Sequence, residues 1–324
     1  MDRRTLLRAG VAGGGLMLAG KAPAQAAFPS RAVRIVVPFA AGGPTDIMAR
    51  GLSQKLGEAL GQSVVVDNRP GGGAQIAASA VKQSAPDGHT LFIGDIGALA
   101  INPSLYQNLS YDPIKDFAPL TMLMSAPTVL LVRSESPIKG MREMVAMTKA
   151  GRPLSFASQG IGTGGHLCME MFKSVAGIEM SHVPYKGSAP AMQDVIAGQV
   201  DALFDVLPSA LPQARAGKIR ILAAATGKRI PSLPDVPTTA ELGFPDVAMD
   251  VWFAAVTLAG TPDDIVRRLS AEIAKAMRDP SVNKRFIDIG FNVEPGTPEQ
   301  LGALMKSEVT RWGAVVKRSG ARAD

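Results

Sequence analysis

The 324-residue sequence contains a single cysteine, Cys168, so no disulfide can form within one molecule. Segments dense in charge of one sign are also missing. The formal net charge is +6, and about half of it lies in the first 26 residues. The remaining positive charge is spread along the chain, whereas a nucleic-acid-binding surface needs a clustered basic face. The composition therefore predicts neither a disulfide-stabilised fold nor a nucleic-acid partner.

Sequence motifs of common enzyme classes are scarce as well. The chain has no G-K-[ST] sequence for a phosphate-binding loop and no G-x-S-x-G sequence for a hydrolase nucleophile. Residues 160–165 match the dinucleotide-binding pattern G-x-G-x-x-G. The strand expected next ends at residues 184–186 without the acidic residue that such a site needs, which argues against a dinucleotide cofactor.

The three histidines are scattered along the chain. His166 and Glu170 stand four residues apart on an expected helix, a spacing that suits two ligands of one metal ion. No third ligand is evident nearby, so the favoured interpretation is a histidine at a helix start near the rim of a cleft. We therefore expect no metal, no cofactor and no catalytic residue.

The first 26 residues have the pattern of a secretory signal peptide. Arg3 and Arg4 are followed by an uncharged stretch over residues 9–20 and by the small-residue sequence A-Q-A at residues 24–26. The uncharged stretch is much shorter than the roughly 20 residues that span a bilayer. The paired arginines favour the twin-arginine export route, with an ordinary Sec signal as the alternative. Either route predicts a soluble periplasmic protein whose signal is removed after residue 26.

The rest of the chain alternates strand-like and helix-like segments. Short apolar, β-branched runs are typical of buried parallel strands, and apolar residues at helical spacing follow most of them. This alternation predicts parallel sheets covered by helices. We expect strands at residues 34–37, 64–66, 90–94, 154–158, 181–184, 202–205 and 219–225, and helices at 46–60, 74–83, 166–175, 189–197, 208–216 and from 262 and 298 onward.

The chain without its signal is longer than one hydrophobic core usually supports, so two domains are expected. The two C-terminal helices have no following strand to cover, and we expect them to pack back onto the first domain. Lobe one then comprises residues 27–126 together with 250–324, and lobe two comprises residues 127–249. The two crossings between these lobes predict a hinge.

Two glycine-rich loops, at residues 40–45 and 159–165, each connect an expected strand to an expected helix. Such a loop leaves the N–H groups of the first helical turn free, and the helix dipole adds positive potential, so an anion can bind without a cationic side chain. Loops of this kind lie at the carboxyl ends of parallel strands, where α/β sheets bind ligands. If the lobes face each other, both loops point into one cleft. Tight turns without a ligand are the alternative interpretation.

Ten segments together give the chain a likeness to a known family. They are R-I-V-V-P-F at 34–39, A-G-G-P-T-D at 41–46, V-D-N-R-P-G at 66–71, A-P-D-G-H-T-L at 85–91, I-N-P-S-L-Y at 101–106, Y-D-P at 111–113, H-V-P-Y-K-G at 182–187, G-Q-V-D at 198–201, P-D-V-P-T at 234–238 and A-G-T-P at 259–262. With these segments the sequence resembles the Bug family, the substrate-binding (TctC-like) proteins of tripartite tricarboxylate transporters. The resemblance covers essentially the whole mature chain.

The resemblance implies the two-lobed periplasmic binding protein (Venus-flytrap) fold, an α/β architecture with parallel-rich sheets flanked by helices and a hinge. It also implies that both loops grip a ligand carboxylate through main-chain amides, hydroxyls and ordered waters. Asp205 matches a position that faces the far end of the ligand, although a helix cap before Pro208 is an alternative role. The expected ligand-binding residues are Phe39, Ala41, Gly42, Gly43, Thr45, Asp46, Ser158, Gly160, Gly162, Thr163, His166, Tyr185 and Asp205.

These features together predict a monomeric periplasmic receptor that closes its lobes around a small carboxylate. The family resemblance implies that the closed form docks onto the membrane permease subunits of a tripartite tricarboxylate transporter, and sensing without a permease is the other use. A hydrolase or lyase acting on a carboxylate with the same scaffold is one alternative. A two-lobed effector domain of a signalling protein is a second, disfavoured because no DNA-binding or membrane segment is attached.

Overall fold

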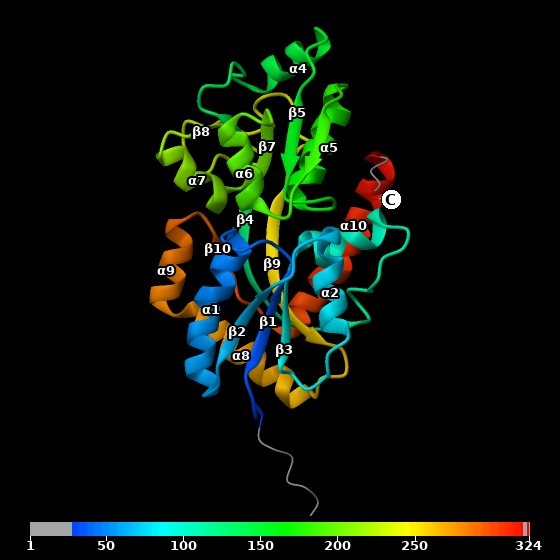
Figure 1. Cartoon of the computed structure of the whole chain (residues 1–324), viewed down its shortest axis with the longest axis vertical. Helices are drawn as coiled ribbons and strands as arrows, with labels where there is room; N and C mark the ends of the chain where they lie inside the picture. The colour runs from blue at the N-terminus through cyan, green and yellow to red at the C-terminus, as the bar shows by residue number, and fades with distance from the viewer. Residues whose placement is uncertain (1–27, 320–322, 324) are drawn as a thin grey trace, which may run out of the picture.

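The computed structural model describes residues 28–319 and residue 323, which form two groups of strands and helices, one above the other (Figure 1). We call the lower group the first lobe and the upper group the second lobe. The expected signal peptide lies outside the described residues. Within the part of the chain that is described, no helix is both long enough and apolar enough to cross a membrane.

The first lobe is a five-stranded sheet with helices on its faces, extended by a short sixth strand. Its sheet order is β2-β1-β3-β9-β4, with β10 paired to β4. The strands β2, β1 and β3 are parallel, whereas β9, β4 and β10 pair in antiparallel fashion. The elements are β1 (Val33–Val37), α1 (Pro44–Leu60), β2 (Val64–Asn68), η1 (Gly72–Ala74), α2 (Gln75–Lys82), β3 (Thr90–Asp95), η2 (Gly97–Ile101), α3 (Asn102–Leu105), the first part of β4 (Phe117–Arg133), β9 (Asp250–Leu258), α8 (Asp263–Arg278), α9 (Pro280–Asp288), β10 (Asn292–Val293) and α10 (Pro298–Ser319).

The second lobe repeats the strand–helix alternation. Its strands β7, β5 and β6 are parallel, and both β7 and β8 pair in antiparallel fashion with the second part of β4. The helices α4 to α7 surround this sheet (Figure 1). The elements are α4 (Met141–Lys149), β5 (Ser155–Ser158), α5 (Gly164–Ala176), β6 (Ser181–Pro184), α6 (Ser188–Ala197), β7 (Ala202–Val206), α7 (Leu207–Arg215) and β8 (Ile219–Ala224).

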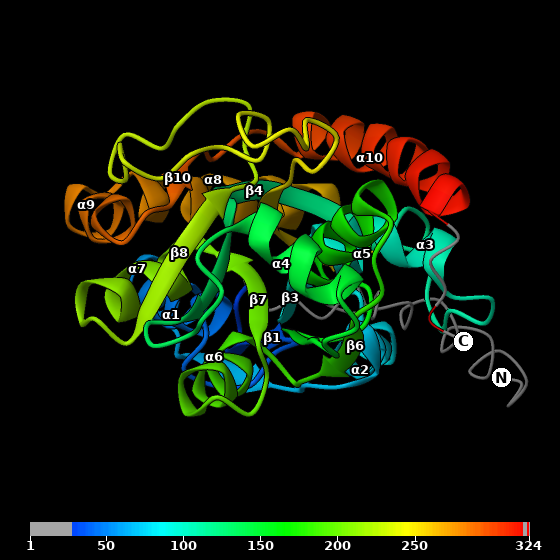
Figure 2. The ribbon, with the colours of Figure 1, turned by 90° about the horizontal axis from the view of Figure 1, so that it is seen from above.

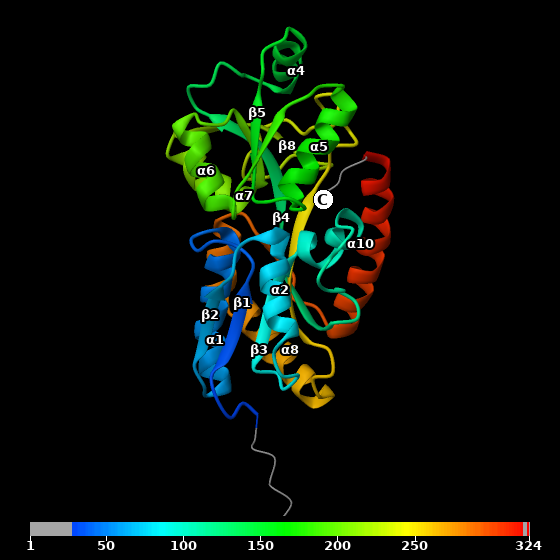
Figure 3. The ribbon, with the colours of Figure 1, turned by 45° about the vertical axis from the view of Figure 1, so that its right-hand side comes forward.

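Strand β4 belongs to both lobes, as Figure 3 shows. Residues 117–127 pair with β9, and residues 128–133 pair with β7 and β8. The chain crosses back just before β9, where Thr128 N–H donates to Met249 O and Met249 N–H donates to Ala225 O. The two lobes are therefore joined by two hydrogen-bonded crossings that lie side by side.

The expected strands and helices correspond to elements of the structure, but several elements were not expected: the helices α3, α4 and α9 and the strands β4, β9 and β10. Pro119 and Pro127 lie inside β4, and proline normally argues against the interior of a strand. The pairing of β4 with β9 shifts register between Pro119 and Thr121, so an irregularity accommodates the first proline. The sequence therefore did not predict the long strand that links the lobes, because it contains prolines, which usually end strands.

The C-terminal helices pack back onto the first lobe, as expected. Helices α8 and α10 both contact β4, and α10 also covers η2 and α3. Both helices lie on the same side of the molecule (Figure 2). Leu269, Ile273 and Met277 are buried at four-residue spacing on α8, which is the apolar stripe of an amphipathic helix. On α10 the largest buried side chain is Trp312, which is 1% exposed.

We predict that Trp312→Ala lowers the free energy of unfolding by about 3–5 kcal/mol, because it leaves a large cavity between α10 and the first lobe. The variant also removes the hydrogen bond that Trp312 Nε1–H donates to Glu308 Oε2 at 2.9 Å. Urea denaturation of both proteins measures the difference. Lys306→Ala, on the exposed face of the same helix, is the control and changes stability by less than about 0.5 kcal/mol. Equal losses in both variants would contradict the prediction.

Candidate functional site

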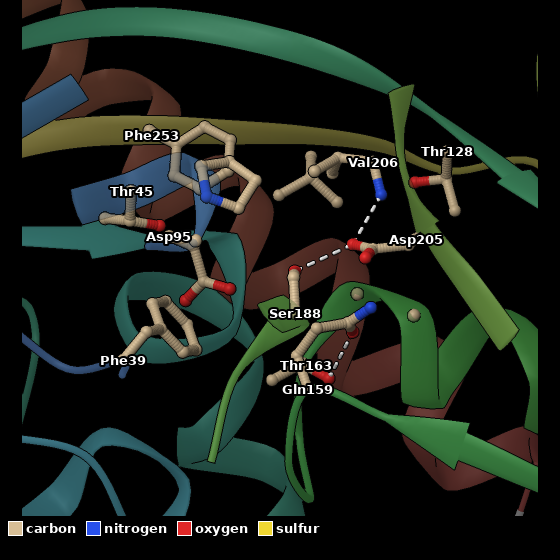
Figure 4. Close-up of a pocket in the computed structure, with 15 residues that line it drawn as sticks. Phe39, Thr45, Asp95, Thr128, Gln159, Thr163, Ser188, Asp205, Val206 and Phe253 are labelled. Carbon is tan, nitrogen blue, oxygen red and sulfur yellow. Dashed lines mark hydrogen bonds between the residues drawn. The ribbon is translucent and has the colours of Figure 1, made fainter. Parts of the chain in front are cut away.

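A cavity lies where the two lobes meet (Figure 4). The cavity volume is about 30 Å³ in this conformation, which is room for a compact group. Both lobes contribute to its wall. The lining residues are Phe39, Gly43, Pro44, Thr45, Asp95, Val251 and Phe253 from the first lobe, and Thr128, Gln159, Thr163, Gly164, Gly165, Ser188, Asp205 and Val206 from the second.

Four of the described helices begin at this cavity. Helices α1 and α5 start after Gly43 and Thr163, while α6 starts at Ser188 and α7 starts after Val206. None of the four N-cap residues makes a side-chain capping hydrogen bond. The first-turn N–H groups and the positive ends of the helix dipoles are thus directed toward one small space.

The loop before α1 is braced from behind by a buried carboxylate. Gly42 N–H donates to Asp46 Oδ2 at 3.0 Å, and Arg50 Nε donates to the same oxygen at 2.9 Å. Burial alone raises the pKa of Asp46, but the hydrogen bonds from Arg50 and Gly42 hold it below its ordinary value. The ionised side chain of Asp46 therefore fixes the loop and does not line the cavity.

The loop before α5 is braced by two stacked histidines. His166 and His182 lie with ring centroids 4.3 Å apart, and Ser158 Oγ is 2.6 Å from His182 Nε2. Gly160 N–H donates to Ser158 Oγ, and Gly162 N–H donates to His166 Nδ1. Burial lowers the pKa of both histidines to about 4, so both rings are neutral at pH 7. These contacts hold the loop from the side away from the cavity.

Five of the thirteen expected ligand-binding residues line the cavity: Phe39, Gly43, Thr45, Thr163 and Asp205. The other eight do not, and several support the two loops instead. Tyr185 donates its hydroxyl hydrogen to Asp194, and Ala41 is exposed. Remaining outside the cavity wall are Gly42, Asp46, Ser158, Gly160, Gly162 and His166.

Gly162, His166 and Glu170 have local structural roles. Gly162 has a φ of +83°, and a Cβ there would lie 2.5 Å from Asn102 Oδ1 of the first lobe, so only glycine fits this contact between lobes. Glu170 Oε1 lies 4.0 Å from His166 Nε2 but only 3.0 Å from Lys173 Nζ. Among the described residues, no cluster of three His, Cys, Asp or Glu side chains has the spacing of a metal site.

The sequence did not indicate Asp95 or Thr128. Asp95 is the last residue of β3, and a polar residue at the carboxyl end of an otherwise apolar parallel strand is the signal that indicates it. Its Oδ1 accepts from Ala98 N–H at 3.0 Å. Thr128 lies in β4, where no signal was available because that strand was not expected. Its buried Oγ1 has no hydrogen-bond partner among the described residues.

Asp205 lies opposite Asp95 in the cavity (Figure 4). Its Oδ1 accepts from Ser188 Oγ at 2.9 Å and from Val206 N–H at 2.8 Å, whereas its Oδ2 is buried and unpartnered in the described structure. The N-cap of α7 is Val206, so Asp205 is not itself that cap residue. Burial raises the pKa of Asp205 and of Asp95 to about 6, although the hydrogen bonds that each accepts act in the opposite direction.

The lobes are also joined by hydrogen bonds outside the cavity wall. Ala40 N–H donates to Lys186 O at 2.8 Å, and Tyr106 Oη donates to Ile161 O at 3.4 Å. Each hydrogen bond joins a first-lobe residue to a second-lobe residue. The molecule is therefore in a closed arrangement, with both glycine-rich loops brought to one cavity.

A family model for the tripartite tricarboxylate transporter family receptor matches residues 48–321. The chain belongs to this family. Protein BugT of Bordetella pertussis is 36% identical over 298 residues, which are 91% of this receptor and 91% of BugT.

Solved structures agree with this assignment. The periplasmic binding protein BugD is 34% identical, with a TM-score of 0.88 over 92% of this receptor and 100% of BugD. MatC of Rhodopseudomonas palustris, solved with bound malate, is 35% identical, with a TM-score of 0.86 over 89% of this receptor and 100% of MatC. These comparisons confirm the two-lobed α/β fold and a substrate-binding receptor, and they give no support to the enzyme alternative.

We predict that Asp205→Asn stabilises the ligand-free receptor at pH 7.5 and that this gain disappears as the pH falls to 4. The pKa of Asp205 is about 6 in the folded protein and near its ordinary value of 3.8 in the unfolded chain, so its ionised form destabilises the fold above pH 6. The destabilisation is relieved as the folded carboxyl takes up a proton between pH 6 and 4. The maximum gain is about 3 kcal/mol.

Urea denaturation across this pH range tests the prediction. Asp201→Asn is the control, because Asp201 accepts hydrogen bonds from Ser155 N–H and Oγ–H at the other end of β7 and its substitution brings no gain at pH 7.5. A constant difference between Asp205→Asn and wild type from pH 4 to 7.5 would show that Asp205 is not a buried titrating group.

Proposed function

We propose that this receptor binds a small carboxylate in the cavity, with the carboxylate oxygens held by first-turn N–H groups of α1 and α5. The observation that carries the proposal is that two uncapped helix starts, one from each lobe, line one cavity. Among the described residues the wall holds no lysine, arginine or histidine, so the helix starts are the available anion-binding groups. The malate bound to MatC, a relative of similar length, supports a carboxylate ligand.

The proposed ligand contacts come from the residues that line the wall. Thr45 lies in the first turn of α1, and Gly164 and Gly165 lie in the first turn of α5. A Cβ at Gly165 would lie 2.2 Å from Phe204 O, so this position must be glycine for the helix to begin against β7. The unpartnered hydroxyl of Thr128 is a further donor to the ligand. Several of the other expected residues act indirectly, by holding the two loops.

Closure of the lobes is the proposed mechanism. Lobe one is proposed to comprise residues 27–126 and 250–324, and lobe two residues 127–249, with the hinge at Thr128 and Met249. The hydrogen bonds between these crossings support this division. Because Thr128 lies both at the crossing and in the cavity wall, a ligand that binds its hydroxyl favours the closed arrangement.

We further propose that the receptor acts as a monomer in the periplasm after removal of residues 1–26. The closed form delivers its ligand to the membrane permease subunits of a tripartite tricarboxylate transporter. The family assignment and the likeness to the periplasmic binding protein BugD support this cellular role.

The proposed function is tested by a thermal-shift and calorimetric screen against dicarboxylates, tricarboxylates, acidic amino acids and aromatic acids. We expect one or more acids to raise the melting temperature, since a ligand at 100 times its Kd stabilises the folded state by about 2.7 kcal/mol. Recovery of the acid unchanged after incubation distinguishes a receptor from an enzyme. Absence of binding by every class of acid, or formation of a product, would contradict the proposal.

We predict that Gly43→Val weakens binding of the tightest acid from this screen at least about tenfold, because the side chain projects into the space beside the start of α1. Gly43 has a φ of −82°, and the nearest atom to a Cβ there is Ala40 O at 3.7 Å, so the fold tolerates the change. Calorimetric titration measures the affinity.

Gly140→Val is the matched control. Gly140 is also an N-cap glycine without a side-chain capping bond, and no atom lies within 4 Å of a Cβ at that position. Both variants lose about 1 kcal/mol of stability at the helix cap, but only Gly43→Val loses affinity. Equal affinity in the two variants would remove the start of α1 from the binding site.

A further inference from the structure

The cavity wall contains two carboxyl groups in a family of receptors for carboxylates. Asp95 comes from the first lobe and is 4% exposed, and Asp205 comes from the second lobe and is 1% exposed. Figure 4 shows them on opposite sides of the same pocket. Neither takes part in an ion pair among the described residues, and the wall holds no cationic side chain. A second negative charge on the ligand would therefore be repelled by the ionised carboxylates of Asp95 and Asp205.

Among the described residues, the carboxylate of Asp205 has hydrogen bonds to only one of its two oxygens. Ser188 Oγ and Val206 N–H both donate to Oδ1 of Asp205, whereas its buried Oδ2 accepts no hydrogen bond in the described structure. A carboxylate that served only to secure the start of α7 would not need a second buried oxygen that no donor of the described structure reaches. Burying an unpartnered charged oxygen is costly unless a donor arrives from the ligand.

Building on the function proposed above, we propose that the ligand is a carboxylate that also carries a protonated amine, and that the amine binds between Asp95 and Asp205. An ammonium group has three N–H donors and one positive charge, so it has donors enough for two carboxylates and a charge that both attract. A hydroxyl group has one donor and no charge, and satisfies one carboxylate at most. The ligand carboxylate keeps its place at the starts of α1 and α5.

The titration behaviour of the two groups agrees with this arrangement. Burial raises the pKa of each to about 6, so both are ionised at neutral pH and a cation stabilises them there. The groups around Asp205 are the neutral side chains of Ser188, Ser209 and Gln159. The titratable neighbour of Asp95 is Tyr111, whose pKa burial raises far above the working range. No neighbouring cation in the described structure already neutralises either carboxylate.

The test uses ligand series with one carbon skeleton and a single difference at the carbon next to a carboxylate. Aspartate, malate and succinate carry an ammonium, a hydroxyl and a hydrogen at this position, and alanine, lactate and propionate form a shorter series. Calorimetric titration of the full mature receptor at pH 7.5 measures each affinity. In the series that fits the cavity, we expect the amino member to bind at least about tenfold tighter than the hydroxyl member, and the unsubstituted acid to bind weakest.

Three variants connect this preference to the carboxylates. Asp205→Asn and Asp95→Asn keep the size of each side chain but remove its charge, and each lowers affinity for the amino member at least about tenfold. Asp201→Asn, at the other end of β7, leaves the preference unchanged. In wild type, affinity for the amino member falls as the pH decreases below about 6 because the carboxyls take up protons, whereas affinity for succinate rises.

The outcomes separate this inference from the proposed function. The inference is overturned if succinate or propionate binds as tightly as its amino counterpart, if both Asn variants keep the wild-type preference, or if the tightest acid of the wider screen has no amine. In each of these cases the receptor still binds a carboxylate, and the proposed function stands. If no acid of any class binds, the proposed function fails as well.

Discussion

The central constraint in this receptor is a pair of helix starts, those of α1 and α5. Each presents backbone N–H groups that no side chain of its N-cap residue bonds to. A helix start has a positive potential but no side chain that can move to follow an anion. Its N–H donors therefore bind an anion well only where the backbone is held in place. The bracing contacts provide that rigidity. Asp46 and Arg50 secure one loop, and the stacked pair His166 and His182 secures the other.

The position of the two helix starts relative to each other depends on β4. The first half of this strand pairs within the first-lobe sheet and the second half pairs within the second-lobe sheet, so the pairing partner changes where the chain passes from one lobe to the other. Thr128 lies at that point, faces the cavity and has an unpartnered hydroxyl in the described structure. In the proposed mechanism, ligand binding and lobe position are coupled through this one residue.

The strand–helix alternation and both glycine-rich loops could be predicted from the sequence because they depend on local patterns: short β-branched runs, helical spacing and glycine before a helix. Asp205, which lines the cavity, was named through the family resemblance. Asp95 and Thr128 were missed because their placement depends on which strands lie together, and β4 and β9 contain prolines or pair in antiparallel fashion. Local patterns likewise cannot distinguish a glycine that lines the cavity, such as Gly43, from Gly162, which fits against Asn102.

A crystal structure of the receptor saturated with its tightest-binding acid tests the central claim most directly. The distances from the ligand carboxylate oxygens to the backbone nitrogens of Thr45, Gly164 and Gly165 decide it. We predict hydrogen bonds of about 2.7–3.1 Å to first-turn nitrogens of both α1 and α5. A carboxylate held by side chains alone, or bound away from one of these helix starts, would contradict the claim that the two opposed helix starts jointly hold the ligand.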